Sequence, residues 1–497
     1  MADLRPMLNL YPDSIGGNLS AAADFLSLTE LHGAFSSVYV LPSLYHSDLD
    51  RGFCVVDYDL EESLATDADL ERLKALGLDL KLDIVLNHAS VRSPQFQDLL
   101  THGEQSEYRD FFIDWNKFWG GCGVMTPEGY IQPEQQDIKD MFFRKPELPI
   151  LMVRFPDGRE VPYWNTFYQK VWEENGERKY LGQMDLNIRS PKVWAFYDET
   201  LRKLAGYGAK IIRLDAFAYA PKAPGRRNFM NEPETWEILA QVKGLADKYG
   251  LTLLPEIHAS YAEGVYRKIA QQGYVTYDFF LPGLILDAIE NQTGEYLAKW
   301  ARELITNHIQ TVNMLGCHDG IPLLDLKGLL PDERIQSLID TAVSRGGLVK
   351  NLHGAKNIYY QVNATYFSAL GEDENKLLLA RAIQMFMPGK PQVWYLDLLE
   401  GTNDYAAVER AGDGGHKEIN RTNLTVKESG DRLDLPVVQK QLDLLRLRNT
   451  HSAFCSNTAI TVNSDGAMLE IVWQNGTHMA RLKVDFQKSE YSIETTQ

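Results

Sequence analysis

Two residues of opposite charge lie inside a short apolar stretch near the middle of the chain. The stretch Lys210–Tyr219 opens with two isoleucines, which are followed by Arg213 and Asp215. Such a run predicts a strand buried in a parallel sheet, where residues two apart point to the same side. A guanidinium beside a carboxylate keeps it ionised, as a carboxylate nucleophile requires. A purely structural ion pair would show the same pattern, so this stretch alone leaves both interpretations open.

Three other apolar runs also end in polar side chains. Their polar ends are Asp83–His88, Pro255–His258 and Cys317–Gly320. A single Asp or His at such a place is usually a satisfied structural group, and Cys317 is better explained by packing because nothing supplies the rest of a thiol triad. Four polar clusters at matching positions are much harder to explain in that way. They predict one common site at the ends of neighbouring strands.

Short apolar runs alternate with amphipathic stretches along the chain. We expect eight strands at Met7–Leu10, Ser37–Leu41, Leu80–Leu86, Lys210–Leu214, Thr252–Pro255, Val275–Phe280, Gln310–Leu315 and Val393–Tyr395. Helical spacing of apolar residues recurs at Leu70–Leu76, Val193–Tyr207, Glu234–Tyr249 and Leu377–Phe386. This alternation predicts an α/β fold, a (β/α)₈ TIM barrel, whose active site lies at the C-terminal ends of its strands.

Two intervals are too long to be simple connections between strands. After the third run, residues 89–184 are rich in Trp, Phe, Pro and Gly and predict an inserted B domain. After the seventh run, residues 320–372 predict a loop subdomain B′. Residues 456–497 alternate apolar and polar side chains around turn signals, which predicts a C-terminal antiparallel β domain. The catalytic barrel is then expected to comprise residues 1–88, 185–319 and 373–455.

Composition narrows the class of protein. The 497 residues carry a formal net charge of −18 and no basic tract, which argues against nucleic acid or an anionic membrane as the main partner. No apolar run approaches the roughly 20 residues that span a bilayer, and no signal peptide is recognisable. Four scattered cysteines are typical of reduced thiols, so we expect a cytoplasmic protein.

The polar clusters resemble the four signature regions of glycoside hydrolase family 13, the α-amylase family. The matching residues are Asn87-His88, Arg213 with Asp215, Glu256, and His318-Asp319. Further stretches resemble the sucrose phosphorylase branch of that family, and the resemblance covers most of the chain. These stretches are Leu10–Asp13, Asp50–Phe53, Ser93–Asp98, Ser106–Tyr108, Cys317–Ile321, Tyr360–Asn363, Ala380–Gln384 and Ile419–Arg421.

The resemblance implies a retaining α-glucoside phosphorylase, which transfers glucose from a disaccharide, sucrose in the first place, to phosphate and yields α-D-glucose 1-phosphate. It implies that Asp215 is the nucleophile and that Asp319 stabilises the transition state. Glu256 would be the acid and base, its proton retained by a partly apolar pocket, with its carboxyl about 5–5.5 Å from that of the nucleophile. The implied glucose pocket consists of Asp50, Phe53, His88, Phe167, Gln183, Arg213, His258 and His318.

Opening a glucosyl-enzyme with phosphate rather than water requires cations on the acceptor side. Arg421 matches an arginine that the family places there, and Arg144 with Lys145 lies in the loop that holds its phosphate-binding arginine. Arginine suits phosphate because its donors form a bidentate fork. The expected acceptor and phosphate set is Arg144, Lys145, Tyr219, Arg226, Arg227, Tyr359, Tyr360, Gln361 and Arg421.

The sequence departs from that branch on the acceptor side. Gly225–Phe229 replaces the usual segment, Asn357–Tyr360 lacks the aspartate used on fructose, and Phe142 stands where a tyrosine is usual. The leaving group therefore stays open between fructose, fructose 6-phosphate, glycerate and glycerol. The basic residues near positions 144 and 226 could bind a second phosphate or a carboxylate. A hydrolase on the same scaffold and an inactive carbohydrate-binding relative also stay open as hypotheses.

The expected ligands are small molecules. Asn87 is a calcium-ligand position in many α-amylases, but no acidic cluster accompanies it here, so we expect neither a metal nor another cofactor. The expected partners are a disaccharide and inorganic phosphate, without nucleic acid or membrane. A homodimer is left open.

Overall fold

Eight parallel strands form the centre of the protein. The computed structural model describes residues 3–141, 147–352, 358–412 and 414–496, without the side chains of residues 350–360. The strands follow one another in space as β14-β13-β5-β2-β1-β19-β16-β15, and β14 also contacts β15, so the sheet closes almost completely into a barrel. They are β1 (Met7–Leu10), β2 (Ser37–Val40), β5 (Asp79–Val85), β13 (Ala209–Asp215), β14 (Thr252–Pro255), β15 (Thr276–Asp278), β16 (Thr311–Asn313) and β19 (Lys390–Trp394).

The predicted TIM barrel is thereby confirmed, since each of the eight expected strands coincides with one of these. Helices follow the strands along the chain, and the four expected helices are α2, α6, α7 and α13. The capping box of Thr66 and Asp69 fixes the start of α2. The helices that follow the barrel strands are α1 (Leu19–Leu26), α2 (Asp67–Ala75), α6 (Pro191–Gly206), α7 (Glu234–Asp247), α8 (Val265–Gln271), α9 (Leu281–Glu290), α10 (Glu295–Thr306), α13 (Glu374–Phe386) and α17 (Pro436–Thr450).

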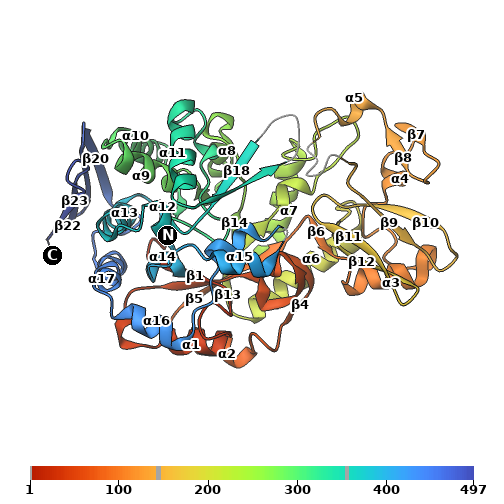
Figure 1. The fold of residues 1–497 in the computed structure, drawn as a ribbon, viewed down its shortest axis with the longest axis horizontal. Helices are drawn as coiled ribbons and strands as arrows, with labels where there is room; N and C mark the ends of the chain where they lie inside the picture. The colour runs from red at the N-terminus through yellow and green to blue at the C-terminus, as the bar shows by residue number, and fades with distance from the viewer. Residues whose placement is uncertain (1–2, 142–146, 353–357, 413, 497) are drawn as a thin grey trace.

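The connection from β5 to β13 forms a small unit at one end of the molecule (Figure 1). Much of it has its own apolar core, which contains Trp115, Trp119 and Trp164 and is separate from the core of the barrel. These three tryptophans thus pack inside this unit. Its elements are β6 (His88–Ser90), α3 (Pro94–His102), α4 (Trp115–Phe118), β7 (Gly123–Met125), β8 (Ile131–Pro133), α5 (Gln135–Ile138), β9 (Ile150–Arg154), β10 (Glu160–Trp164), β11 (Gln169–Glu174) and β12 (Glu177–Asp185).

The connection from β16 to α13 lies beside the C-terminal end of the barrel. Its strand β18 pairs with the chain just beyond Asp319, through a bridge between Ile321 and Val362. The elements here are the short helix η7 (Leu324–Leu326), α11 (Asp332–Ser344), β17 (Leu348–Leu352), β18 (Ile358–Asn363) and α12 (Tyr366–Ala369).

Beyond β19 the chain returns across the same end of the barrel. This part contains α14 (Tyr395–Leu398), α15 (Tyr405–Ala411), η8 (Gly415–Asn420) and α16 (Val426–Leu433) before α17. Early in the chain, β3 (Tyr45–Leu49), η3 (Asp50–Gly52) and β4 (Cys54–Leu60) form a hairpin that lies near η8 through Arg51. Segments more than 350 residues apart in sequence are thereby brought to one place.

A four-stranded antiparallel sheet occupies the opposite end of the molecule from the inserted unit (Figure 1). Its strands are β20 (Ala459–Asp465), β21 (Met468–Asn475), β22 (His478–Asp485) and β23 (Glu490–Thr496), in simple up-and-down order. The sheet packs on α13, which is buried from Leu377 to Phe386 because the barrel covers its other side. The C-terminal β domain is therefore confirmed, whereas the exact domain boundaries stay predictions.

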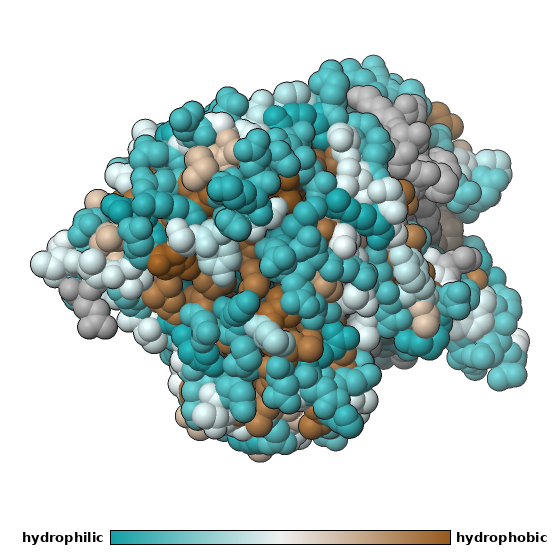
Figure 2. Space-filling model, turned by 60° about the vertical axis from the view of Figure 1, so that its left-hand side comes forward, coloured by the Kyte–Doolittle hydropathy of each residue, from teal (hydrophilic) through white to brown (hydrophobic). Residues whose placement is uncertain are grey.

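On the face drawn in Figure 2, hydrophilic side chains predominate and apolar ones show mainly near its middle. Within the described ranges, no helix combines the length and the apolar character that crossing a bilayer requires.

Candidate active site

Arg213 connects three carboxylates at the end of the barrel. One terminal nitrogen, Nη1, lies 2.7 Å from Asp83 Oδ1 and 3.0 Å from Asp215 Oδ1, and the other, Nη2, lies 2.9 Å from Glu256 Oε1. The side-by-side placement of Arg213 and Asp215 that the spacing predicted is confirmed. Asp215 and Glu256 approach the same guanidinium from neighbouring strands, so both carboxylates face one site. Their predicted separation stays a prediction.

Burial and the neighbouring charges act differently on the two carboxylates of this pair. Burial and the charge of Glu256 raise the pKa of Asp215, whereas Arg213 lowers it. Burial also acts to raise the pKa of Glu256, but Arg213 and His258 outweigh it and lower that pKa. Arg213 thus acts on both carboxylates in the direction that favours ionisation, and its role in keeping Asp215 ionised stays a prediction.

His258 links Glu256 to a carboxylate that the sequence did not single out. Its Nε2 lies 3.4 Å from Glu256 Oε1, and its Nδ1 lies 3.0 Å from Asp325 Oδ2. The imidazole stacks on Phe279 with 3.8 Å between ring centroids. Asp325 was missed because it is a single acidic residue in the short helix η7, 67 positions beyond its partner in the sequence.

Two cations and an imidazole surround Asp319. Lys417 Nζ lies 2.6 Å from Asp319 Oδ1, Arg421 Nη2 lies 3.7 Å from the same oxygen, and His318 Nε2 lies 3.2 Å from Oδ2. Although burial raises it, these three groups hold the pKa of Asp319 well below its usual range. Asp319 is therefore ionised, as a group that stabilises an oxocarbenium-like transition state must be.

Lys417 was not predicted, although its ammonium lies between two of the predicted carboxylates. Besides Asp319 it approaches Asp50 Oδ2 at 3.8 Å, and Arg421 Nη1 approaches Asp50 Oδ1 at the same distance. Among the described residues, Arg421 Nη2 is a buried nitrogen without a hydrogen-bond acceptor. These cations and carboxylates present alternating charges to the space between them, a pattern suited to sugar hydroxyls.

The Asp50 turn is held in a strained conformation. Asp50 and Arg51 have φ values of 48° and 49°, in the left-handed region that few residues adopt. Arg51 compensates by donating from Nη1 to Arg421 O at 2.8 Å, pairing with Asp13 at 2.9 Å and stacking on Tyr11 at 4.3 Å. Arg51 therefore positions Asp50, and no local pattern in the sequence indicates this because its partners lie far along the chain.

Phe53 and two histidines form the apolar side of the predicted glucose pocket. The Phe53 ring stacks on His318 at 5.1 Å, and its carbonyl accepts hydrogen bonds from His88 Nε2 at 2.9 Å and Gln183 Nε2 at 3.2 Å. Burial lowers the pKa of His88 to about 4 and that of His318 to about 3, so both imidazoles are neutral. Phe167 packs against His88 at 5.0 Å. The structure thus brings the predicted glucose-side residues together.

An aromatic wall continues toward the predicted acceptor side. The Tyr219 ring lies 5.3 Å from Phe167 and 4.8 Å from Phe229. Beyond this wall, Arg226 pairs with Glu234 at 2.7 Å, and Arg227 donates to Met230 O at 3.0 Å. Arg226 is thus already neutralised, whereas Arg227 has no ion pair with a carboxylate in the described part of the chain.

The remaining predicted acceptor residues are only partly visible. Arg144, Lys145 and the nearby Phe142 lie outside the described residues. Tyr359, Tyr360 and Gln361 belong to β18, where the side chains of the two tyrosines are not described. Their strand adjoins the site, because Asn363 Nδ2 donates to Asp319 O at 2.8 Å.

The buried ammonium of Lys222 contacts Asn87, which occupies a calcium-ligand position of many α-amylases. Lys222 Nζ is 2.8 Å from Asn87 Oδ1, 2.8 Å from Asp185 Oδ2 and 2.5 Å from Tyr219 O. The Lys222 side chain is 1% exposed. The oxygen atoms that could ligate a cation here are thus satisfied by a lysine of the chain itself.

Other groupings could in principle bind a metal. Donor atoms of Glu256, His258 and Asp319 lie within 4.8 Å of one another, as do those of Cys317, His318 and Asp319. The ion pairs described above already engage these carboxylates with cationic side chains, and a divalent ion would have to displace them. The expectation that no metal is needed stays a prediction.

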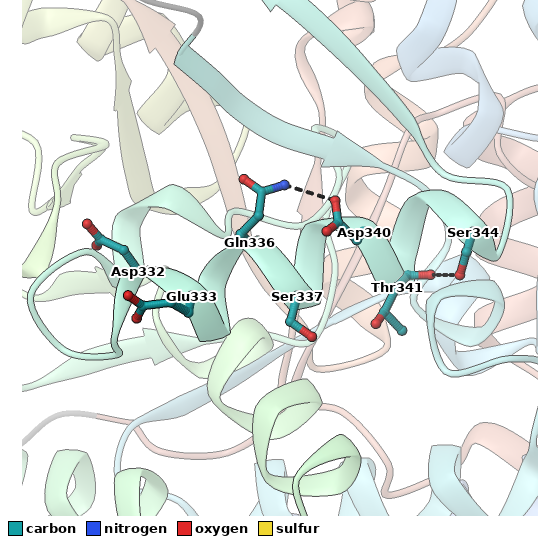
Figure 3. Close-up of a pocket in the computed structure, with 7 residues that line it drawn as sticks. All are labelled: Asp332, Glu333, Gln336, Ser337, Asp340, Thr341 and Ser344. Carbon is teal, nitrogen blue, oxygen red and sulfur yellow. Dashed lines mark hydrogen bonds between the residues drawn. The ribbon is translucent and has the colours of Figure 1, made fainter.

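A separate hollow lies on the outer face of α11, as Figure 3 shows. Within it, Gln336 donates to Asp340 at 2.9 Å and Ser344 donates to Thr341 O at 2.8 Å. Its lining comes from a single helix and contains none of the convergent groups of the barrel end. We therefore assign the chemistry to the barrel and not to this surface.

Comparisons with known proteins agree with this geometry. Residues 28–320 match the family model described as "Alpha amylase, catalytic domain". The chain is 53% identical to sucrose 6(F)-phosphate phosphorylase of Ilumatobacter coccineus, over 98% of this chain and 95% of the relative. It is 34% identical to sucrose phosphorylase of Streptococcus mutans, over 98% and 97% respectively. The crystal structure of sucrose 6F-phosphate phosphorylase from Thermoanaerobacter thermosaccharolyticum superposes with a TM-score of 0.90 at 35% identity, covering 100% of this chain and 96% of that one.

Proposed function

Because the chain belongs to the α-amylase family, we propose that it is a retaining disaccharide phosphorylase acting on sucrose 6′-phosphate. The products are then α-D-glucose 1-phosphate and fructose 6-phosphate. The observation that carries the choice of donor is the 53% identity to a sucrose 6(F)-phosphate phosphorylase along nearly the whole of both chains. The sequence motifs favoured sucrose and left its 6′-phosphate open, and the similarity favours the 6′-phosphate.

In the proposed reaction Asp215 attacks the anomeric carbon while Glu256 protonates the departing glycosidic oxygen. A covalent β-glucosyl ester forms on Asp215, and Asp319 stabilises the positive charge that develops on the sugar ring. An oxygen of inorganic phosphate then attacks the same carbon while Glu256 accepts its proton. Two inversions give net retention at the anomeric carbon.

The glucose unit is proposed to occupy the space between the charged cluster and the aromatic side chains. Lys417 and Asp50 would bind its distal hydroxyls, since their opposite charges offer both donors and acceptors. Arg421, expected on the acceptor side, would contribute here too because it lies 3.8 Å from Asp50. The neutral imidazoles of His88 and His318 would bind further hydroxyls, with the ring of Phe53 against the apolar face of the sugar.

For the second phosphate, Arg227 is a stronger candidate than Arg226. The charge of Arg226 is already compensated by Glu234 at 2.7 Å, and breaking that pair would offset the gain from binding phosphate. Arg227 forms no ion pair with a carboxylate in the described part of the chain, although its charge helps to lower the pKa of Glu232, and it precedes Phe229 by two residues. Arg144 and Lys145 stay in the proposal on the strength of the sequence alone.

The test is a donor panel with and without inorganic phosphate. Sucrose 6′-phosphate should release α-D-glucose 1-phosphate at a rate that depends on phosphate, with a kcat/KM at least tenfold above that of sucrose. Glucosylglycerol and glucosylglycerate complete the panel. Free glucose as the main product would identify a hydrolase, and preference for unmodified sucrose would overturn the donor assignment.

Two arginine variants sharpen this test. Arg227→Gln should raise KM for sucrose 6′-phosphate roughly tenfold, about 1.4 kcal/mol of binding, with little effect on sucrose. Arg226→Gln is the matched control, because its charge is already paired. Equal effects of both variants would contradict the assignment of Arg227.

A cytoplasmic location and a homodimer belong to the proposal as well. All four cysteines are unpaired, which supports a reducing compartment. The homodimer is proposed from the sequence alone. Sedimentation equilibrium of the purified protein measures its mass in solution and tests this proposal.

A further inference from the structure

A buried imidazole joins two carboxylates in line at the mouth of the barrel. Asp325 Oδ2 lies 3.0 Å from His258 Nδ1, and His258 Nε2 lies 3.4 Å from Glu256 Oε1. The side chains of Asp325 and His258 are each 7% exposed. Carboxylate, imidazole and carboxylate therefore form a continuous chain that ends on the proposed acid and base.

Packing fixes the orientation of the imidazole. Its ring stacks on Phe279 at 3.8 Å with only 20° between the planes, and Phe279 in turn stacks on Tyr277 at 5.1 Å. In this orientation Nδ1 faces Asp325 in η7, and Nε2 faces Glu256 at the end of β14. Such fixed orientation is what a group needs if it is to pass a proton in one direction.

The charged groups around His258 come from several elements. Glu256 and Asp325 contact it directly, while Arg213, Asp319 and Glu263 act on these two carboxylates from a greater distance. Burial lowers the pKa of His258, but Asp325 and Glu256 outweigh burial and raise it to about 10. At neutral pH the imidazole therefore carries both protons and holds Glu256 ionised.

This state conflicts with the proposed reaction unless a proton can move. Glu256 must carry a proton when the glycosidic oxygen departs, yet Arg213 and His258 favour its ionised form. A proton is nevertheless available within hydrogen-bonding reach, on Nε2 of His258. Its transfer turns an ion pair into a neutral pair and removes the charge that kept Glu256 ionised.

We propose that His258 supplies the proton of Glu256 and that Asp325 is the positioning residue that makes this transfer possible. The N–H bond at Nε2 breaks, its electron pair stays on the imidazole, and an O–H bond forms at Glu256 Oε1. Asp325 holds the remaining proton on Nδ1. When Glu256 later accepts the proton of the attacking phosphate, the transfer runs backward and His258 regains its charge, so no proton is gained or lost over the cycle.

The inference rests on the proposed function, and donors with different leaving groups separate the two. Sucrose 6′-phosphate needs acid catalysis because an alkoxide is a poor leaving group, whereas α-D-glucosyl fluoride needs little. In Asp325→Asn, kcat with sucrose 6′-phosphate should fall roughly ten- to a hundredfold, within the 10²–10⁴ that general acid catalysis contributes as a whole. Turnover of α-D-glucosyl fluoride should change less than about threefold.

The pH profile gives a second readout. Without the Asp325 charge, His258 loses its proton at lower pH. In a plot of kcat against pH, the fall on the alkaline side should therefore occur about one pH unit or more lower. His258→Gln keeps hydrogen-bonding atoms but cannot titrate, and it should show the same contrast between the two donors. Asp332→Asn, an exposed change in the same connection, is the control and should match the wild type.

Each outcome decides the matter. An equal loss with both donors, or an unchanged rate and pH profile in both variants, would overturn the relay. Release of glucose instead of glucose 1-phosphate by the wild type would overturn phosphorolysis alone, because the contrast between donors still reports on the acid. A wild-type chain that cleaves neither donor would overturn both.

Discussion

Replacing Lys222 by methionine tests how the inserted unit is fixed to the barrel. The ammonium contacts Asn87 after β5, Asp185 at the end of β12 and the carbonyl of Tyr219 after β13. Methionine fills most of the same volume without the charge. The change therefore isolates the electrostatic link among three segments of the site.

The expected loss follows from the burial of the pair. Removing one partner of a buried ion pair costs about 3–5 kcal/mol, because the other charge is left without compensation. The Asp185 carboxylate keeps three hydrogen bonds, from Thr166 N at 2.8 Å, Thr166 Oγ1 at 2.7 Å and Asn87 Nδ2 at 3.1 Å. We therefore expect the lower end of that range, about 3 kcal/mol.

Urea denaturation followed by circular dichroism measures this loss. Lys243→Met is the matched control, because Lys243 forms an exposed pair with Asp247 at 2.6 Å that should contribute less than about 0.5 kcal/mol. KM for the donor should also rise in Lys222→Met, since Tyr219 loses its hydrogen-bond donor. A loss in Lys222→Met no greater than in the control would refute the reasoning.

Two further variants probe the glucose side. Lys417→Met removes the cation 2.6 Å from Asp319 and should lower kcat/KM about tenfold, measured as glucose 1-phosphate release; unchanged kinetics would exclude Lys417 from the site. Gly52→Ala places a Cβ about 2.1 Å from Ser43 N at a φ of +111°, so the turn carrying Asp50 must shift, and a thermal melt should show destabilisation together with a raised KM. A variant with wild-type KM would show that this turn does not position Asp50.

Several features of the protein could be predicted from the sequence because they depend on local pattern. The apolar runs located all eight barrel strands, since a strand buried on both faces must be apolar along its length. Strand spacing put Arg213 beside Asp215, and the C-terminal ends of parallel strands meet at one edge. For that reason Glu256 and Asp319 could be assigned to the same site before any coordinates were known.

Tertiary structure alone decided how charge is distributed in that site. Lys417 meets Asp50, and Asp325 meets His258, only because connections from different strands return to the same end of the barrel. The lowered pKa of Glu256 follows from the same fact, because it depends on every charge within a few ångströms, whatever its position in the chain. Local sequence determines which side chains stand at the ends of the strands, and the packing of distant segments determines the electrostatic state in which they are held.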